Sequence, residues 1–428
     1  MEPSVATHQR PLRVALVGLG TVGKAVAAQL LDPTWRAAVS ARGLVPPVLT
    51  AVGVRDPDRP RGIVLPRTVK RTANLMDLAV DPSYDVIVEV IGGTDDAGLV
   101  VRQALAWGKP VVTANKALLA EKGASLERVA RDSDVALRFE AAVGGGIPVL
   151  APLVSDLSSN QIEAVRGIVN GTTNHILSAM AEDGRDYADV LAESQERGYA
   201  EADPSGDVEG HDAANKLAVL TRLAFDTWPD VRRLRFRAPS VSGDAAPGIT
   251  CVRLYELERA AELGLTLKLV ARAEPGEDGG VRAAVTPVAV KATSPLGATG
   301  GVTNLIEVVA EPVGRVSFRG PGAGGPATAA AILSDLLAIG RDKRISTWGH
   351  LPPARAAAPV RDDLDGDRAW FFVLRELLGA PMPKAVEEVA LASAGDAFVT
   401  RPIALDALRA RLAPLGCDVP LYPVIPEA

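Results

Sequence analysis

The sequence of 428 residues predicts an α/β protein: a doubly wound parallel sheet, a second α+β domain and a small C-terminal α+β extension. Three observations support this architecture. A glycine-rich turn follows an apolar strand near the N-terminus, apolar runs then alternate with helical patterns as far as about residue 145, and later runs succeed one another as in a mostly antiparallel sheet. A chain of this length is expected to form two or three domains.

Composition excludes several classes of protein. Hydrophobic residues make up 47% and charged residues 23%, which is typical of soluble globular proteins. The net charge of −6 and the lack of a basic run argue against nucleic acid as a partner. No apolar stretch is long enough to predict a membrane span, the first residues lack a signal-peptide layout, and Cys251 and Cys417 form no motif. We therefore expect a cytoplasmic protein.

The first element is a strand at residues 13–17, which runs into the sequence GLGTVG and then a helical pattern at residues 24–31. Gly18 permits the tight turn, Gly20 leaves room for a pyrophosphate, and Gly23 lets helix and strand pack closely. The free amides at the start of the helix face the phosphates. The alternative is a glycine-rich turn without a ligand. The predicted dinucleotide-binding residues of this turn are Gly18, Leu19, Gly20, Thr21, Val22 and Gly23.

The following elements have the spacing of a doubly wound sheet. Further strands are predicted at residues 48–54, 85–91, 110–113 and 135–139, with helices at 99–107 and 118–131. The strands are continuous apolar or β-branched runs, as expected of strands covered on both faces. Residues 11–145 are therefore interpreted as a Rossmann-type domain, which a helix near residues 320–340 completes.

Loops at the carboxyl ends of these strands bear on the cofactor. Arg55 follows the second strand and is suited to the 2′-phosphate of NADP, whereas Asp56 suits the ribose of NAD, so both cofactors stay open with NADP favoured. Arg55 as a solvated loop charge is the alternative. The sequence IGGTDD brings Gly93 and Thr94 to the edge of the sheet where ligands bind, and TANKALLA brings Lys116 to the same edge.

The second domain, residues 146–320, contains an acidic stretch that reads EADPSGDVEGHDAANK. Asp212 and Lys216 lie four residues apart on one helix face, which continues through apolar residues. The pair is therefore expected at the edge of a core or cleft, where it would serve proton transfer or substrate binding. A partly buried structural ion pair is the alternative. Strands are predicted at residues 163–169, 266–272, 281–290, 304–310 and 314–318.

The chain resembles the homoserine dehydrogenase family over about residues 11–340. The sequences GLGTVG, IGGTDD, TANKALLA, EAAVGGGIP, NGTTN, GYAEADPSGDVEGHDAANK and GPGAGG carry this resemblance by their order and spacing. It implies NAD(P)H-dependent, reversible reduction of L-aspartate 4-semialdehyde to L-homoserine, in threonine and methionine biosynthesis. It also implies a homodimer formed through the sheet of the second domain.

The chemistry of this substrate gives the candidate residues their roles. Its ammonium requires carboxylates, for which Glu201, Asp207 and Asp212 are candidates, and its carboxylate requires donors, for which Thr172 and Thr173 are candidates. The resemblance implies Lys216 as the proton donor, with Lys116 as a second active-site lysine and Asp212 orienting Lys216. It also implies that Gly322 contacts the cofactor and that a structural sodium ion binds at Glu140, Val143, Gly145 and Ile147.

The tail departs from the family. Residues 341–367 are rich in Pro, Arg and Asp and are predicted to form a linker to an extension at residues 368–428. Many bacterial relatives end in an ACT-type ligand-sensing domain, but the acid-x-Pro-Gly turn of that domain is absent here, and Leu378–Pro381 is at best a remnant of it. A diverged ACT-like regulatory domain is expected, and feedback inhibition stays open.

The sequence leaves two other functions open. A semialdehyde dehydrogenase that acylates a cysteine needs an activated thiol, and Cys251 has no base in its sequence context. A catalytically silent NAD(P)-binding regulatory protein has no need for Lys116 and Lys216. Both lysines are retained, which favours an enzyme.

Overall fold

The computed structural model describes residues 10–276, 279–355, 359–361, 364, 366–375 and 381–426. The chain forms two compact units, which are described separately. The first comprises Met1–Ser159, Arg222–Trp228 and Ala323–Ala356, and the second comprises Asn160–Thr221, Pro229–Gly322 and Ala357–Ala428. Parts of the expected linker and most of the segment 378–381, where the ACT-type turn was sought, lie outside the described residues.

The first unit contains a parallel sheet with the strand order β3-β2-β1-β4-β5-β6, which confirms the predicted doubly wound architecture. The strands are β1 (Arg13–Val17), β2 (Val48–Gly53), β3 (Lys70–Thr72), β4 (Val86–Glu89), β5 (Val111–Thr113) and β6 (Leu137–Arg138). Four of the predicted strands are shorter here, by one to three residues, and β3 was not predicted because its residues are polar and mostly exposed.

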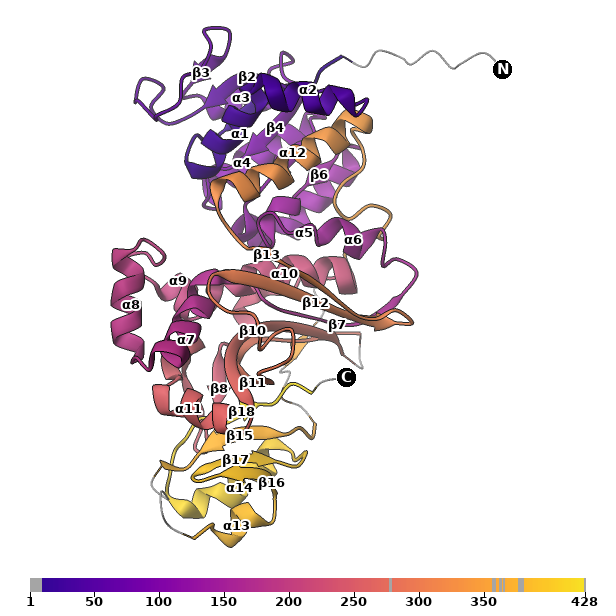
Figure 1. Ribbon diagram of the computed structural model, residues 1–428. Helices are drawn as coiled ribbons and strands as arrows, with labels where there is room; N and C mark the ends of the chain where they lie inside the picture. The colour runs from indigo at the N-terminus through magenta and orange to yellow at the C-terminus, as the bar shows by residue number, and fades with distance from the viewer. Residues whose placement is uncertain are drawn as a thin grey trace. The chain divides into compact units, whose positions relative to one another are not determined.

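Helices cover both faces of this sheet. They are α1 (Thr21–Leu31), α2 (Pro33–Ala41), α3 (Leu75–Val80), α4 (Asp95–Ala106), α5 (Lys116–Asp132), α6 (Leu150–Val154) and α12 (Gly325–Arg341), with the 3-10 turn η1 (Glu140–Ala142). Figure 1 shows α12, in orange, among the indigo and purple elements from the start of the chain. It packs against α1, and Ile332 and Leu336 share one apolar core with Val14 and Leu16.

The second unit contains a mostly antiparallel sheet with the order β13-β12-β7-β10-β11-β14, in which only β14 runs parallel to its neighbour. Its strands are β7 (Gln161–Ile168), β10 (Leu265–Pro275), β11 (Val281–Lys291), β12 (Thr303–Glu311), β13 (Gly314–Pro321) and β14 (Val360–Arg361), and a separate pair is β8 (Arg237–Pro239) with β9 (Asp244–Pro247). This is the predicted α+β domain.

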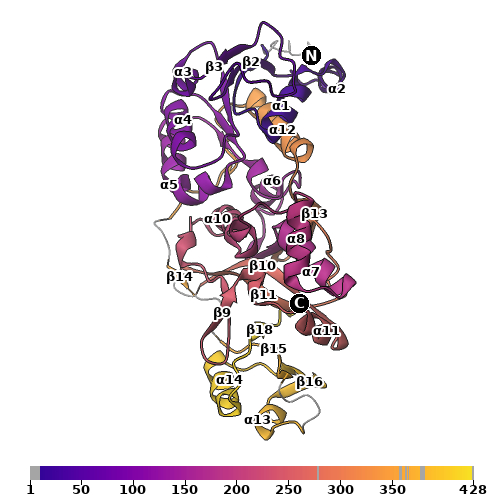
Figure 2. The same ribbon diagram turned by 90° about the vertical axis from the view of Figure 1, so that its left-hand side faces the viewer.

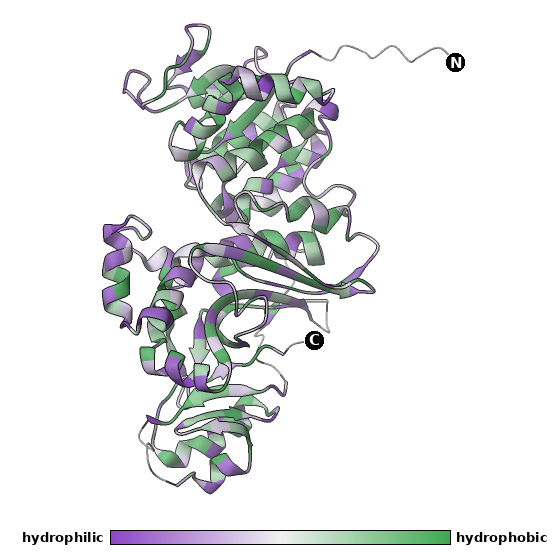
Figure 3. Ribbon diagram, viewed as in Figure 1, coloured by the Kyte–Doolittle hydropathy of each residue, from purple (hydrophilic) through white to green (hydrophobic). Residues whose placement is uncertain are grey.

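The helices of the second unit differ in polarity. They are α7 (Gly171–Asp183), α8 (Tyr187–Glu196), α9 (Ser205–Val208), α10 (His211–Phe225, whose last turn belongs to the first unit) and α11 (Leu254–Glu262), with 3-10 turns η2 (Val231–Arg233) and η3 (Gly248–Cys251). Figure 3 shows α8 largely purple and the sheet strands largely green, so α8 faces solvent while the strands form the core. No described helix combines the length and apolarity that a membrane span requires.

The C-terminal extension has the chain order strand–helix–strand–strand–helix–strand. Its elements are β15 (Trp370–Val373), α13 (Lys384–Glu387), β16 (Ala390–Ala394), β17 (Ala397–Thr400), α14 (Leu405–Leu412), the 3-10 turn η5 (Ala413–Leu415) and β18 (Tyr422–Pro423). The sheet order is β16-β17-β15-β18 with antiparallel neighbours, and Figure 2 shows α13 and α14 on one side of it. Trp370, Phe372, Phe398 and Leu408 lie in its core.

The extension is joined to α11 by a buried hydrogen bond. The Tyr422 hydroxyl donates to Glu256 Oε2 at 2.9 Å, and Glu256 also accepts from the Arg253 amide at 2.8 Å. Burial raises the pKa of Glu256 to about 7, and these hydrogen bonds counteract the rise only in part. The Glu256 carboxyl therefore binds a proton more tightly in the folded protein than in the unfolded chain.

The free energy of unfolding is expected to fall as pH rises from 4.5 to about 7. The contribution of Glu256 is full below its ordinary pKa of 4.5 and is lost as pH rises through about 7, a difference of about 3 kcal/mol. The thermal midpoint of the intact chain, compared with that of Glu256→Gln between about pH 5 and pH 8, measures this contribution. An identical pH slope in the two proteins would contradict the assignment.

Candidate active site

The glycine-rich turn after β1 has the geometry that close approach of a ligand requires. Gly18 has a φ of +109°, and a Cβ there would lie 2.7 Å from the Val90 carbonyl oxygen. A Cβ on Gly23 would lie 2.2 Å from the Gly18 oxygen, so α1 packs tightly on the turn. Gly20 has open space at its Cβ position, and α1 begins at the next residue, Thr21. A phosphate group fits this opening at the start of the helix.

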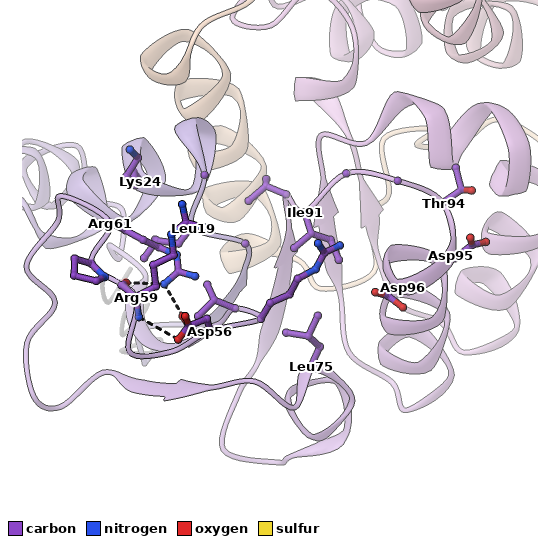
Figure 4. Close-up of a pocket in the computed structure, with 18 residues that line it drawn as sticks. Leu19, Lys24, Asp56, Arg59, Arg61, Leu75, Ile91, Thr94, Asp95 and Asp96 are labelled. Atoms are coloured by element: carbon purple, nitrogen blue, oxygen red, sulfur yellow. Dashed lines mark hydrogen bonds between the residues drawn. The ribbon is translucent and has the colours of Figure 1, made fainter. Parts of the chain in front are cut away.

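A cavity of 980 Å³ extends from this turn along the carboxyl edge of the sheet (Figure 4). Of the cofactor residues predicted from the sequence, Gly18, Leu19, Gly20, Arg55, Gly93 and Thr94 line it. Thr21, Val22, Gly23 and Lys116 do not, and Gly322 belongs to the second unit. Both the opening at Gly20 and the size of the cavity suit a dinucleotide.

Three cationic residues that sequence reasoning missed also line the cavity: Lys24, Arg59 and Arg61. Figure 4 shows them near Asp56, at the end opposite Asp95 and Asp96. The Asp56 carboxylate accepts the amides of Asp58 at 3.1 Å and Arg59 at 3.2 Å, which folds the loop back toward the turn. The available signal was the sequence RDPDRPRG directly after β2, because the adenosine ribose is held at that strand end.

Lys116 is the first residue of α5, at the carboxyl end of β5, and it is partly buried. Asn115 caps this helix, because its side-chain oxygen accepts the Leu118 amide at 3.0 Å. The Asn115 side-chain nitrogen donates to the Gly93 carbonyl at 2.7 Å. The start of α5 is thereby tied to a loop that lines the cavity.

The second unit holds a buried cluster around Lys216. The Lys216 ammonium donates to Asp212 Oδ2 at 2.7 Å and to the Val169 carbonyl at 2.6 Å, and the residue is only 8% exposed. Asn170 Nδ2 donates to Asp207 Oδ1 at 2.7 Å and to Asp212 Oδ2 at 2.9 Å. One amide thus holds two carboxylates beside one ammonium. The part played by Asn170 was not predicted, although the motif NGTTN marked its position.

The remaining predicted substrate residues lie around the start of α7. Asn170 accepts the Thr173 amide at 2.9 Å as the helix cap, and the Thr173 hydroxyl, 1% exposed, is bound to Asn170 in return. The Thr172 hydroxyl donates to the Tyr199 carbonyl at 3.0 Å. Glu201 lies in the exposed loop before α9. The structure therefore brings Asp207, Asp212 and Lys216 together but engages both threonine hydroxyls locally.

The Glu140 segment forms a separate polar site in the first unit. The Glu140 carboxylate, 6% exposed, accepts the amides of Val149, Leu150 and Ala151 at 2.9 Å each. Its own amide donates to Asp335, and burial together with the Asp335 charge raises the pKa of Glu140. Arg138 is the ion-pair partner of Asp335, at 2.7 Å. Of these two buried carboxylates, Asp335 is paired with Arg138, whereas Glu140 is bound by backbone amides.

Cys251 does not have the character of a nucleophile. It is buried, its Sγ lies 3.4 Å from the Gly248 carbonyl, and burial raises the pKa of its thiol to about 12. The reactive form of a cysteine is the thiolate, which is negligible near neutral pH at such a pKa. This disfavours a semialdehyde dehydrogenase that acylates this residue.

Comparison with models of known protein families identifies the class of this protein. Residues 18–140 match the family model described as "Homoserine dehydrogenase, NAD binding domain", so the chain is an NAD(P)-dependent oxidoreductase. Residues 148–337 match the model described as "Homoserine dehydrogenase". Together these matches cover most of the chain.

Individual relatives agree with the family models. The chain is 42% identical to a homoserine dehydrogenase of Corynebacterium glutamicum over 80% of this chain and 76% of that protein. It is 40% identical to one of Synechocystis sp. over 77% and 73% of the two chains. A crystal structure of a homoserine dehydrogenase from Thiobacillus denitrificans superposes with a TM-score of 0.84 at 30% identity, over 97% and 98% of the two chains. The chain belongs to the homoserine dehydrogenase family.

Proposed function

We propose that this chain reduces L-aspartate 4-semialdehyde to L-homoserine with NADPH and that Lys216 exchanges the proton with the substrate oxygen. The main support is the buried Lys216 ammonium, bound at 2.7 Å to Asp212 and at 2.6 Å to the Val169 carbonyl. The bound cofactor supplies a hydride to the aldehyde carbon. The oxygen takes one proton from Lys216, which becomes a neutral amine and regains its proton from solvent.

The carboxylates of the cluster suit the ammonium of the substrate. Asp207 and Asp212 are both held by Asn170, so they present two negative charges beside one lysine. Glu201 is proposed as a third acceptor from the loop before α9. The amides at the start of α7, near Thr172 and Thr173, suit the substrate carboxylate. Lys116 is proposed as the second active-site lysine.

The choice of substrate is tested by comparing two aldehydes. NADPH oxidation by the intact chain is measured with L-aspartate 4-semialdehyde and with succinate semialdehyde, which lacks the ammonium group. Turnover of only the first supports the proposed roles of Asp207 and Asp212. Equal turnover of both aldehydes would contradict those roles, and no turnover of either would favour a silent regulatory protein.

NADPH is the proposed cofactor because Arg55, Arg59 and Arg61 all line the cavity after β2, while the Asp56 carboxylate is engaged by its own loop. Charge-assisted hydrogen bonds to a 2′-phosphate contribute about 1.5–3 kcal/mol each. Replacing both Arg55 and Arg59 with Gln should therefore raise the KM for NADPH by about a hundredfold and leave the KM for NADH nearly unchanged. Arg102→Gln on the exposed side of α4 is the control. Equal rises for both cofactors would contradict the assignment.

A sodium ion is proposed at Glu140, Val143, Gly145 and Ile147. Arg138 pairs with Asp335 while backbone amides bind the Glu140 carboxylate, so a monovalent cation would balance this second buried carboxylate. Backbone carbonyls and one carboxylate suit such a hard cation. The thermal midpoint of the intact chain should rise with added sodium more than with lithium, and Glu140→Gln should abolish the difference.

Assembly and setting are further proposals. A homodimer formed through the sheet of the second unit follows from the family, and sedimentation of the purified chain tests it.

An ACT-like role for the extension agrees with its strand order and antiparallel pairing, and threonine titration of the intact enzyme tests it. Cytoplasmic threonine and methionine biosynthesis is the proposed setting.

A further inference from the structure

Glu89 is a buried carboxylate that the proposed mechanism does not use. It is the last residue of β4, its exposed fraction is 0%, and it lies at the carboxyl edge of the parallel sheet. Buried carboxylates normally have a cationic partner, because removing a charge from water is costly. The hydrogen bonds that Glu89 accepts come instead from neutral groups at the carboxyl ends of β4 and β5.

The loop after β4 is the one that lines the cofactor cavity. Glu89 Oε1 accepts the Ile91 amide at 2.9 Å and, more weakly, the Gly92 amide at 3.4 Å. Both residues line the cavity. The Thr113 hydroxyl, at the end of β5 and just before the loop that joins β5 to α5, donates to Glu89 Oε2 at 2.5 Å. One carboxylate therefore fixes two neighbouring strand ends.

Asn115 closes the link between these loops. Its amide donates to the Thr113 oxygen at 3.0 Å, and its side-chain nitrogen donates to the Gly93 carbonyl at 2.7 Å. The same nitrogen lies 3.5 Å from Glu89 Oε1. Since Asn115 also caps α5, the network extends from the cavity loop to the residue before Lys116.

The donors around Glu89 favour the negatively charged form of its carboxyl group. The Thr113 oxygen is occupied as an acceptor by the Asn115 amide, so its hydrogen is free to point at Glu89. A distance of 2.5 Å is typical of a hydroxyl bound to a carboxylate. Burial raises the pKa of Glu89, and all four hydrogen bonds oppose that rise.

The position of β4 determines which half of the cofactor would lie nearest the Glu89 carboxylate. The strand order reverses between β1 and β4, and a dinucleotide lies across such a reversal. The adenosine half belongs on the side of β1 and β2. The nicotinamide half therefore belongs on the side of β4 and β5, above Glu89.

We propose that Glu89 is a positioning residue that holds the Ile91–Gly93 loop and the start of α5 in place, and that its charge favours the oxidised, positively charged nicotinamide over the reduced, neutral one. The inference rests on the proposed NADP cofactor. The network sets the shape of the nicotinamide site, and the carboxylate sets its electrostatic potential without touching the ring.

Cofactor binding without substrate tests both the positioning role and the electrostatic role of Glu89. Dissociation constants of NADPH, from its fluorescence, and of NADP+, by competition, are measured near pH 8 for the intact chain and three variants. Glu89→Gln keeps the shape of the side chain and removes its charge, so the ratio of the NADP+ constant to the NADPH constant should rise about tenfold. Thr113→Val removes two hydrogen bonds, the one that the Thr113 hydroxyl donates to Glu89 and the one that it accepts from the Asn115 amide, and it keeps the Glu89 charge. Both constants should therefore rise together and leave the ratio unchanged.

Glu127→Gln is the matched control, because it alters another buried carboxylate of the same unit that does not line the cavity. It should lower the thermal midpoint and leave both constants unchanged. An unchanged ratio in Glu89→Gln would overturn the electrostatic part. If that variant does not fold, Asn115→Ala tests the positioning part, which wild-type affinity for both cofactors would overturn. Homoserine turnover plays no part in these measurements, so failure of the proposed activity is detected separately.

Discussion

Replacing Lys216 with Met is expected to lower kcat by about a hundredfold to ten-thousandfold, which is the range for loss of a general acid or base. The Lys216 ammonium lies beside Asp212 and the Val169 carbonyl in a site that is nearly closed to solvent. Water is therefore a poor substitute as the proton donor. The KM for the semialdehyde should change much less than kcat, because Asp207 and Asp212 remain.

Lys109→Met is the control for this experiment. Lys109 is also a buried lysine, 7% exposed, and its ammonium also donates to backbone carbonyls, those of Leu78 and Asp81. It precedes β5 and so lies at the amino edge of the parallel sheet, away from the ligand edge. The control should lose stability and keep its kcat. A Lys216→Met enzyme with kcat within threefold of the intact chain would remove Lys216 from the mechanism.

The sequence predicted most strands of the two six-stranded sheets, because most of those strands are apolar runs. β1, β2, β4 and β5 consist mostly of buried apolar or β-branched residues, and such runs predict strands covered on both faces. β3 escaped prediction because its three residues are polar and its stability comes from pairing with β2. Helix α2 was missed although Asp32 and Pro33 form a helix start, since only Val39 among its residues is fully buried.

In the candidate site, the sequence predicted the residues whose positions follow from local spacing along one helix. Asp212 and Lys216 were found because their spacing alone places them on one helix face. Arg59 and Glu89 were not found, because their importance depends on how loops fold. Asp56 turns the Arg59 loop toward the cavity, and Glu89 is significant only through donors that lie 2 to 26 residues away in the chain. A carboxylate inside an apolar strand was nevertheless a usable signal, because burying one demands compensation.

The largest effect on stability is expected at Arg222. Its side chain is fully buried, and its Nε and Nη2 donate to the two oxygens of Glu127 at 2.8 Å and 2.7 Å. Arg222→Met would leave the Glu127 carboxylate buried with Trp228, at 2.9 Å, and the partly exposed Arg131. Removing one partner of a buried pair costs about 3–5 kcal/mol, so the thermal midpoint of the first unit should fall by about 6–20 °C.

A double-mutant cycle separates the pair from its surroundings. Glu127→Gln removes the other charge, and the double variant Glu127→Gln with Arg222→Met should be less destabilised than the sum of the single changes, since neither charge is then left buried alone. Arg232→Met is the control, because Arg232 pairs with Asp230 at 2.9 Å while 86% exposed, and such pairs contribute less than about 1 kcal/mol. Additive single changes would mean that Arg222 acts by filling space, and that Arg131, Trp228 and the Ala354 amide compensate the charge of Glu127.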